Sequence, residues 1–171
     1  MRLFLSWKHI ISLCFVLLHL SLSIAHATVV PKQHRLLIIN SYNEGAPWSQ
    51  TLITPIMLQT SSIEDVNADL VHINGTFIRN DSLYNQMEEG IFQRYERNKP
   101  DYLVLIGSIA FTLRDRIQKE WGDIPMVLIA NEDTYAPREY YFTGRSKNME
   151  DNTVAPLNDI REQYNFTFIE A

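Results

Sequence analysis

The stretch Leu36-Leu-Ile-Ile-Asn-Ser-Tyr-Asn-Glu-Gly-Ala-Pro-Trp-Ser49 decides the fold class of this 171-residue chain. It opens with four consecutive apolar residues, which are typical of a strand buried on both faces of a parallel sheet. Turn-forming residues follow, and we predict a helix from about Ser49 to Thr60, with Pro55 expected to kink it or shift its start. A buried strand that passes through a polar turn into a helix is the opening of a βαβ unit.

The same alternation of strand and helix continues along the chain. Further strands are predicted at residues 69–73, 102–106 and 125–130, and helices at about 80–98 and 108–120. In the first of these helices, Leu83, Met87 and Ile91 recur at four-residue spacing and predict the buried face. We therefore predict an α/β fold with an open parallel sheet, helices on both faces and the flavodoxin-like strand order 2-1-3-4. Residues 166–169 also have the composition of a strand, but the sequence offers them neither a following helix nor a partner.

The first 27 residues are predicted to be a signal peptide. They contain no acidic residue, carry Arg2 and Lys8 near the start, and end in the small-residue pattern Ala25-His-Ala27. The apolar run between these ends is about 15 residues long, whereas a membrane-spanning helix needs about 20. Cleavage is therefore favoured over retention as an anchor, and we expect a periplasmic or extracellular protein. Membrane contact is expected only through this segment, if it stays uncleaved.

Composition and motifs restrict the possible functions. The chain has 20 acidic and 15 basic residues, a net charge of −5, and no run of Lys or Arg, so a nucleic-acid partner is not expected. Its single cysteine excludes an intramolecular disulfide. It lacks the Gly-x-Ser-x-Gly, Walker and Gly-x-Gly-x-x-Gly motifs, so we predict no catalytic residue and no cofactor. Its few histidines are poorly spaced for a metal site, and none is predicted.

Candidate ligand-binding residues follow the predicted strands. In open α/β sheets, ligands bind beyond the carboxyl ends of the strands. The loops at that edge carry hydroxyls, amides, carboxylates and aromatic rings, which suit a small polar ligand. The candidates are Ser41, Tyr42, Asn43, Trp48, Thr76, Gly107, Ser108, Asn131, Glu132 and Asp133. Each of them could also serve as a turn, cap or core residue, so the prediction rests on their joint placement.

The element Asn40-Ser-Tyr42, followed by Pro47-Trp48, resembles the start of the periplasmic sensor domains of bacterial hybrid two-component histidine kinases. Those domains are similar to class I periplasmic substrate-binding proteins. Residues 101–108 and 124–131 fit the third and fourth strands of the same lobe, and the resemblance spans about residues 35–145. It implies a two-lobed clamp that closes on a ligand and signals through a membrane helix to a cytoplasmic kinase.

The resemblance also implies a domain organisation. Residues 28–145 would be the first lobe of a periplasmic-binding-protein-like domain, and residues 146–171 the start of a crossover toward a second lobe that the chain lacks. The cleft residues it implies are Ser41, Tyr42, Trp48, Ser108 and Asn131.

Three functional hypotheses stay open at this point. The leading one is a non-catalytic, extracytoplasmic ligand-sensing module that is an N-terminal fragment of a sensor histidine kinase. The others are a self-sufficient secreted flavodoxin-like enzyme and a protein-interaction domain, including a homodimer formed through the lobe.

Overall fold

A computed structural model of the chain describes residues 33–131, 134–136, 138 and 155–171, which belong to one compact unit, Gln33–Ala171. The predicted signal peptide, residues 1–27, lies outside the described residues. Among the helices in the described part of the chain, none combines the length and the apolar character needed to cross a bilayer.

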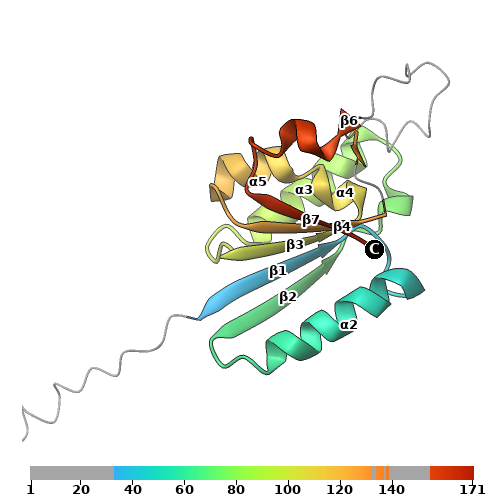
Figure 1. The fold of residues 1–171 in the computed structure, drawn as a ribbon. Helices are drawn as coiled ribbons and strands as arrows, with labels where there is room; N and C mark the ends of the chain where they lie inside the picture. The colour runs from blue at the N-terminus through green and yellow to red at the C-terminus, as the bar shows by residue number, and fades with distance from the viewer. Residues whose placement is uncertain (1–32, 132–133, 137, 139–154) are drawn as a thin grey trace, which may run out of the picture. The chain divides into compact units, whose positions relative to one another are not determined.

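Five parallel strands form the central sheet, in the order β2-β1-β3-β4-β7 (Figure 1). The predicted order 2-1-3-4 is confirmed for the first four strands. The strands are β1 (His34–Asn40), β2 (Val66–His72), β3 (Tyr102–Ile106), β4 (Met126–Ala130) and β7 (Phe166–Glu170), and a separate antiparallel pair joins β5 (Thr134–Tyr135) to β6 (Ala155–Pro156).

β7 extends the sheet by one strand beyond the prediction. It pairs in parallel with β4, from Met126 opposite Phe166 to Ala130 opposite Glu170. The expectation that residues 166–169 have no partner was therefore wrong. The Phe166 ring packs against the Phe111 ring, with centroids 5.2 Å apart, so apolar burial against a helix accompanies the pairing.

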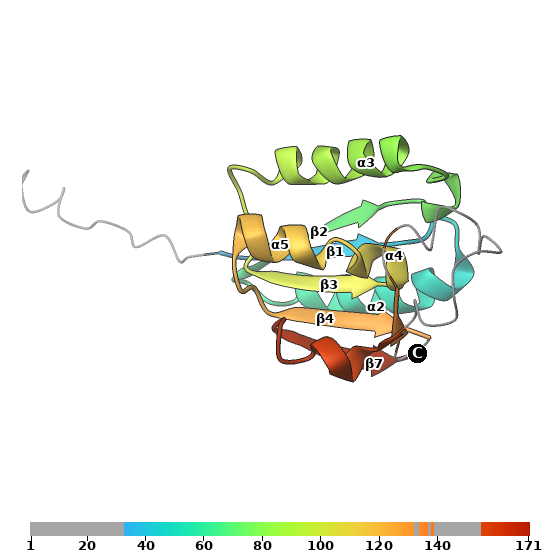
Figure 2. The ribbon, with the colours of Figure 1, turned by 90° about the horizontal axis from the view of Figure 1, so that it is seen from above.

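Helices cover both faces of the sheet, as predicted (Figure 2). The α-helices are α2 (Pro47–Ser61), α3 (Asp81–Arg94), α4 (Ser108–Phe111) and α5 (Arg114–Trp121), and the 3₁₀ helices are η1 (Gly75–Phe77) and η3 (Leu157–Ile160). Alternate strand residues supply two cores, because successive side chains point to opposite faces. Ile38 and Val104 pack toward α2, whereas Leu37, Leu103 and Leu105 pack toward α3 and α5.

Several helix boundaries differ from the predictions. Helix α2 begins at Pro47, with Ala46 as its N-cap residue, and continues through Pro55. Ser49, where the helix was predicted to begin, is instead fully buried inside the first turn. The predicted helix over residues 108–120 is two helices, α4 and α5.

The buried face of α3 also differs from the prediction. Leu83 is 41% exposed, and its neighbour Tyr84 is fully buried in its place. Asn80 caps this helix by accepting a hydrogen bond from the Leu83 N–H at 3.0 Å. The cap fixes where the helix begins, and the Tyr84 ring, not Leu83, faces the core.

Candidate functional site

The carboxyl ends of β1 and β3 form a topological switch point. The two strands are neighbours, with Asn40 opposite Ile106, and the Ser41 N–H donates to the Ile106 carbonyl at 2.8 Å. Helix α2 follows β1 on one face of the sheet, and α4 follows β3 on the other (Figure 1). The chain therefore leaves the two strands in opposite directions, which is where open α/β sheets place their ligand sites.

Ser41 connects the segments that follow β1, β2 and β3 at this edge and is buried, with 5% exposure. Its carbonyl accepts a hydrogen bond from the Gly75 N–H at 2.8 Å, which ties in the loop after β2. Its hydroxyl oxygen accepts a hydrogen bond from the Ala110 N–H, also at 2.8 Å. Ser41 therefore positions the loops, and its acceptor capacity is largely used within the protein.

Gly107 allows the loops after β1 and β3 to pack closely. Its φ of 83° and ψ of 163° lie in a region that glycine adopts readily and L side chains avoid. A Cβ atom at this position would lie 2.9 Å from both Ser41 Oγ and Tyr42 Cε2. The Tyr42 ring thus rests against the backbone of Gly107, and only glycine leaves room for it.

Tyr42 and Trp48 form an aromatic pair at the same edge. Their rings meet edge to face, with centroids 5.2 Å apart. Trp48, in the first turn of α2, packs against the core between that helix and the sheet, whereas Tyr42 remains 36% exposed. Burial raises the pKa of the Tyr42 phenol above its usual value, so the hydroxyl is neutral and can both donate and accept hydrogen bonds. Tyr42 supplies the accessible ring, and Trp48 supports it.

A buried amide that sequence analysis missed holds this loop in place. The Asn40 side chain is fully buried, and its Nδ2 lies 3.2 Å from the Tyr42 carbonyl, 3.3 Å from Ser49 Oγ and 2.9 Å from His72 Nδ1. Its Oδ1 accepts a hydrogen bond from the Tyr42 N–H at 3.3 Å. An asparagine directly after the apolar run at residues 36–39 was the available signal, but turn-forming asparagines share that signal.

The other candidates lie around this centre. Ser108 follows Gly107 and is partly exposed, and Asn43 is exposed. Thr76 and Asn131 are exposed in the loops after the flanking strands β2 and β4, and the Thr76 hydroxyl donates to Asn74 Oδ1 at 3.1 Å. Glu132 and Asp133 lie outside the described residues. The structure thus brings Ser41, Tyr42, Trp48, Gly107 and Ser108 together and places Thr76 and Asn131 one strand away on either side.

This arrangement suits non-covalent binding. It offers one aromatic face, hydroxyls and side-chain amides, which can stack on and hydrogen-bond to a small polar molecule. Among the described residues, no group of three or more His, Cys, Asp or Glu side chains is placed to hold a metal ion.

Comparison with known proteins gives no match, whether against protein-family models, curated proteins or solved structures.

Proposed function

We propose that the chain is a non-catalytic ligand-sensing module that acts outside the cytoplasm and binds a small polar molecule at the β1–β3 switch point. The observation that carries this proposal is the packing of the Tyr42 ring on Gly107. The Tyr42 ring, held by Gly107 and Trp48, therefore lies beside Ser108 at the edge of the sheet where α/β proteins bind their ligands. No covalent step is required of these residues.

The resemblance of residues 35–145 to the periplasmic sensor domains of hybrid histidine kinases supports the same proposal. In a two-lobed clamp of that kind, this edge of the first lobe would form one wall of the ligand cleft. One wall supplies only part of the contacts that closure completes, so we expect weak binding, with a Kd on the order of millimolar. The proposed location rests on the signal-peptide pattern of residues 1–27.

A ligand screen followed by mutation tests this proposal. Amino acids, monosaccharides and small organic acids would be screened for an increase in the unfolding temperature of the full chain. Each stabilising compound would then be titrated calorimetrically against a Tyr42→Ala, Ser108→Ala double variant. We expect at least tenfold weaker binding, because the variant loses the stacking face and a hydroxyl contact. Trp48 is left intact, since it packs in the core beneath α2.

The matched control is a Tyr102→Ala, Ser61→Ala double variant. It makes the same chemical changes at residues that are exposed away from the switch point, since Tyr102 begins β3 and Ser61 ends α2. The control is expected to bind like the unmodified chain. Equal affinity of the Tyr42/Ser108 variant and the unmodified chain would refute the site.

A second candidate function is association with another copy of the chain. β7 is the last strand in the sheet order, and Ile169 on it is 47% exposed. An edge strand with an exposed apolar side chain favours pairing with a second strand. We expect concentration-dependent sedimentation that an Ile169→Lys substitution abolishes, and a monomer at every concentration would exclude this function.

A further inference from the structure

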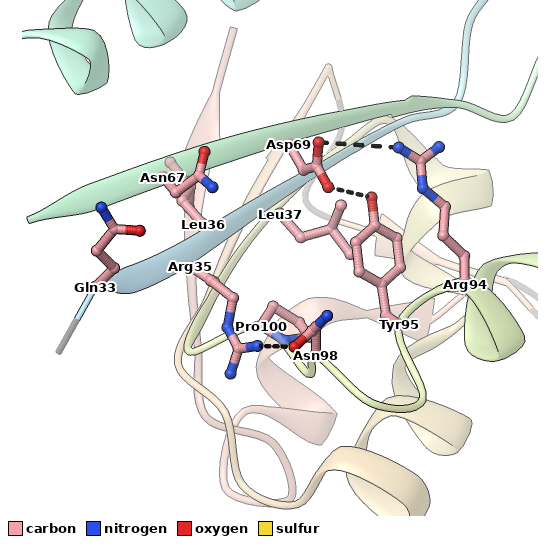
Figure 3. Close-up of a pocket in the computed structure, with 10 residues that line it drawn as sticks. All are labelled: Gln33, Arg35, Leu36, Leu37, Asn67, Asp69, Arg94, Tyr95, Asn98 and Pro100. Atoms are coloured by element: carbon pink, nitrogen blue, oxygen red, sulfur yellow. Dashed lines mark hydrogen bonds and ion pairs between the residues drawn. The ribbon is translucent and has the colours of Figure 1, made fainter.

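A cavity lies at the opposite, amino-terminal edge of the sheet (Figure 3). Its volume is about 460 Å³, within the range of small-molecule sites. It is bounded by the first residues of β1 and β2, the carboxyl end of α3 and the loop that follows α3. This cavity is separate from the switch point and makes no use of the residues proposed to bind there.

Strand register builds the floor of the cavity. Arg35 lies opposite Asn67, and Leu37 lies opposite Asp69, so these four side chains share one face of the β1–β2 pair. Leu37 and Tyr95, which are 1% and 6% exposed, lie buried beneath this face and support it. The Tyr95 hydroxyl donates to Asp69 Oδ2 at 3.0 Å, which fixes the ring (Figure 3).

The side chains that line the cavity carry a net positive charge in an acidic protein. Its lining contains two guanidinium groups, on Arg35 and Arg94, and one carboxylate, on Asp69. The whole chain carries a net charge of −5. A concave site whose charge opposes that of the protein concentrates anions locally.

The two guanidinium groups are held in place without close ion pairs. Arg35 Nη1 donates to the Asn98 side-chain oxygen at 3.1 Å, and the Arg94 guanidinium lies 5.4 Å from the centre of the Tyr95 ring. Asp101 Oδ2 lies 3.9 Å from Arg35 Nε, and Asp69 Oδ1 lies 3.9 Å from Arg94 Nη2.

Arg116, in a second cavity between α3 and α5, shows the contrast. Its guanidinium contacts carboxylate oxygens of Glu89 and Glu120 at 2.7 Å and of Glu88 at 3.4 Å. That guanidinium is saturated by the protein itself. Arg35 and Arg94 keep N–H groups for the fork-like contact with a carboxylate that arginine makes best.

Side-chain amides complete the lining. Gln33, Asn67 and Asn98 each present both a donor and an acceptor, the combination that a hydroxyl group matches. We propose that this cavity binds a small hydroxy-carboxylate. Its carboxylate contacts Arg35 at one end of the cavity, and its hydroxyls contact the amides and, at the other end, Arg94 (Figure 3).

Titration of the full chain with D-gluconate tests this proposal, with sorbitol as the neutral analogue. We expect calorimetric binding of gluconate and no binding of sorbitol. Each of Arg35→Gln and Arg94→Gln is expected to weaken gluconate binding about tenfold or more, because each removes a charge-assisted contact. Arg97→Gln is the matched control, since Arg97 is an exposed arginine on the same loop that does not line the cavity.

Amide chemical shifts of the unmodified chain provide a measurement that does not depend on the variants folding. Gluconate is expected to shift the signals of Gln33, Asn67 and Asn98. The proposal is overturned if gluconate produces neither heat nor these shifts, if sorbitol binds as well as gluconate, or if Arg97→Gln weakens binding as much as Arg94→Gln does.

Discussion

Replacing Gly107 with alanine tests the close packing at the switch point. An alanine would have to adopt φ 83°, ψ 163°, which costs about 1–3 kcal/mol. Its Cβ would also lie 2.9 Å from Ser41 Oγ, which is buried and hydrogen-bonded to Ala110 N, and 2.9 Å from the Tyr42 ring. Overpacking of this kind costs about 1–3 kcal/mol more. We expect Gly107→Ala to lower the free energy of unfolding by about 4 kcal/mol, which combines the midpoints of these two ranges.

Two other glycines separate the backbone cost from the packing cost. Gly122 has φ 91°, but no atom lies within 4 Å of the position that a Cβ would take, so Gly122→Ala is expected to lose only about 1–3 kcal/mol. Gly90 lies inside α3 with open space around it, so Gly90→Ala is expected to gain about 0.5–1 kcal/mol.

Equilibrium urea unfolding of the three variants measures these differences. With a slope of about 2 kcal/mol per molar urea, a loss of about 4 kcal/mol moves the midpoint down by about 2 M. The reasoning is refuted if Gly107→Ala loses no more stability than Gly122→Ala, because the Tyr42 ring would then not be packed against this loop.

Three further outcomes are expected. Asn40→Ala should lower the free energy of unfolding by about 2–3 kcal/mol in urea, because it strands buried hydrogen-bonding groups, whereas the exposed Asn43→Ala should change it by less than about 0.5 kcal/mol. Burial raises the pKa of Tyr84 and of Tyr95 to about 12, and the hydrogen bond to Asp69 adds to the effect at Tyr95. An unfolded chain releases these protons near pH 10, so the free energy of unfolding should fall as the pH rises from about 10 to 12. The fall should be shallower in Tyr84→Phe, which lacks one of the two hydroxyls. A fall as steep in Tyr84→Phe as in the unmodified chain would contradict the raised pKa of Tyr84. Protein recovered from outside the cytoplasm of an expressing cell should have the intact mass of a chain that begins at Thr28, and retention of Met1 would show an uncleaved leader.

Much of the sheet could be predicted from sequence because its central strands are buried on both faces. The continuous apolar runs at residues 36–39 and 102–106 are too short for buried helices and fit doubly covered strands, and right-handed crossovers limit the order in which they pair. The partner of β7 could not be predicted in the same way. The pairing of Phe166 with Met126 is non-local, and the chain between them carries little periodic pattern.

Sequence could predict which edge of the sheet the candidate residues occupy, but not the contacts that they make there. Topology alone brings Tyr42 and Gly107 to one edge of the sheet. Sequence could not show that the Ser41 hydroxyl accepts a hydrogen bond from Ala110, or that Trp48 supports the ring instead of facing solvent. Nor could it distinguish the buried Asn40, which ends β1, from the exposed Asn43, since both are turn-forming amides just after the apolar run at residues 36–39.

The central claim is that a small polar ligand binds at the β1–β3 switch point. The most direct test is an amide chemical-shift map of the full chain, titrated with amino acids, monosaccharides and small organic acids. The account predicts that at least one compound shifts the signals of Tyr42, Gly107 and Ser108 in a saturable manner. If no compound moves these signals, or if every shift falls elsewhere in the chain, the switch point is not a ligand site.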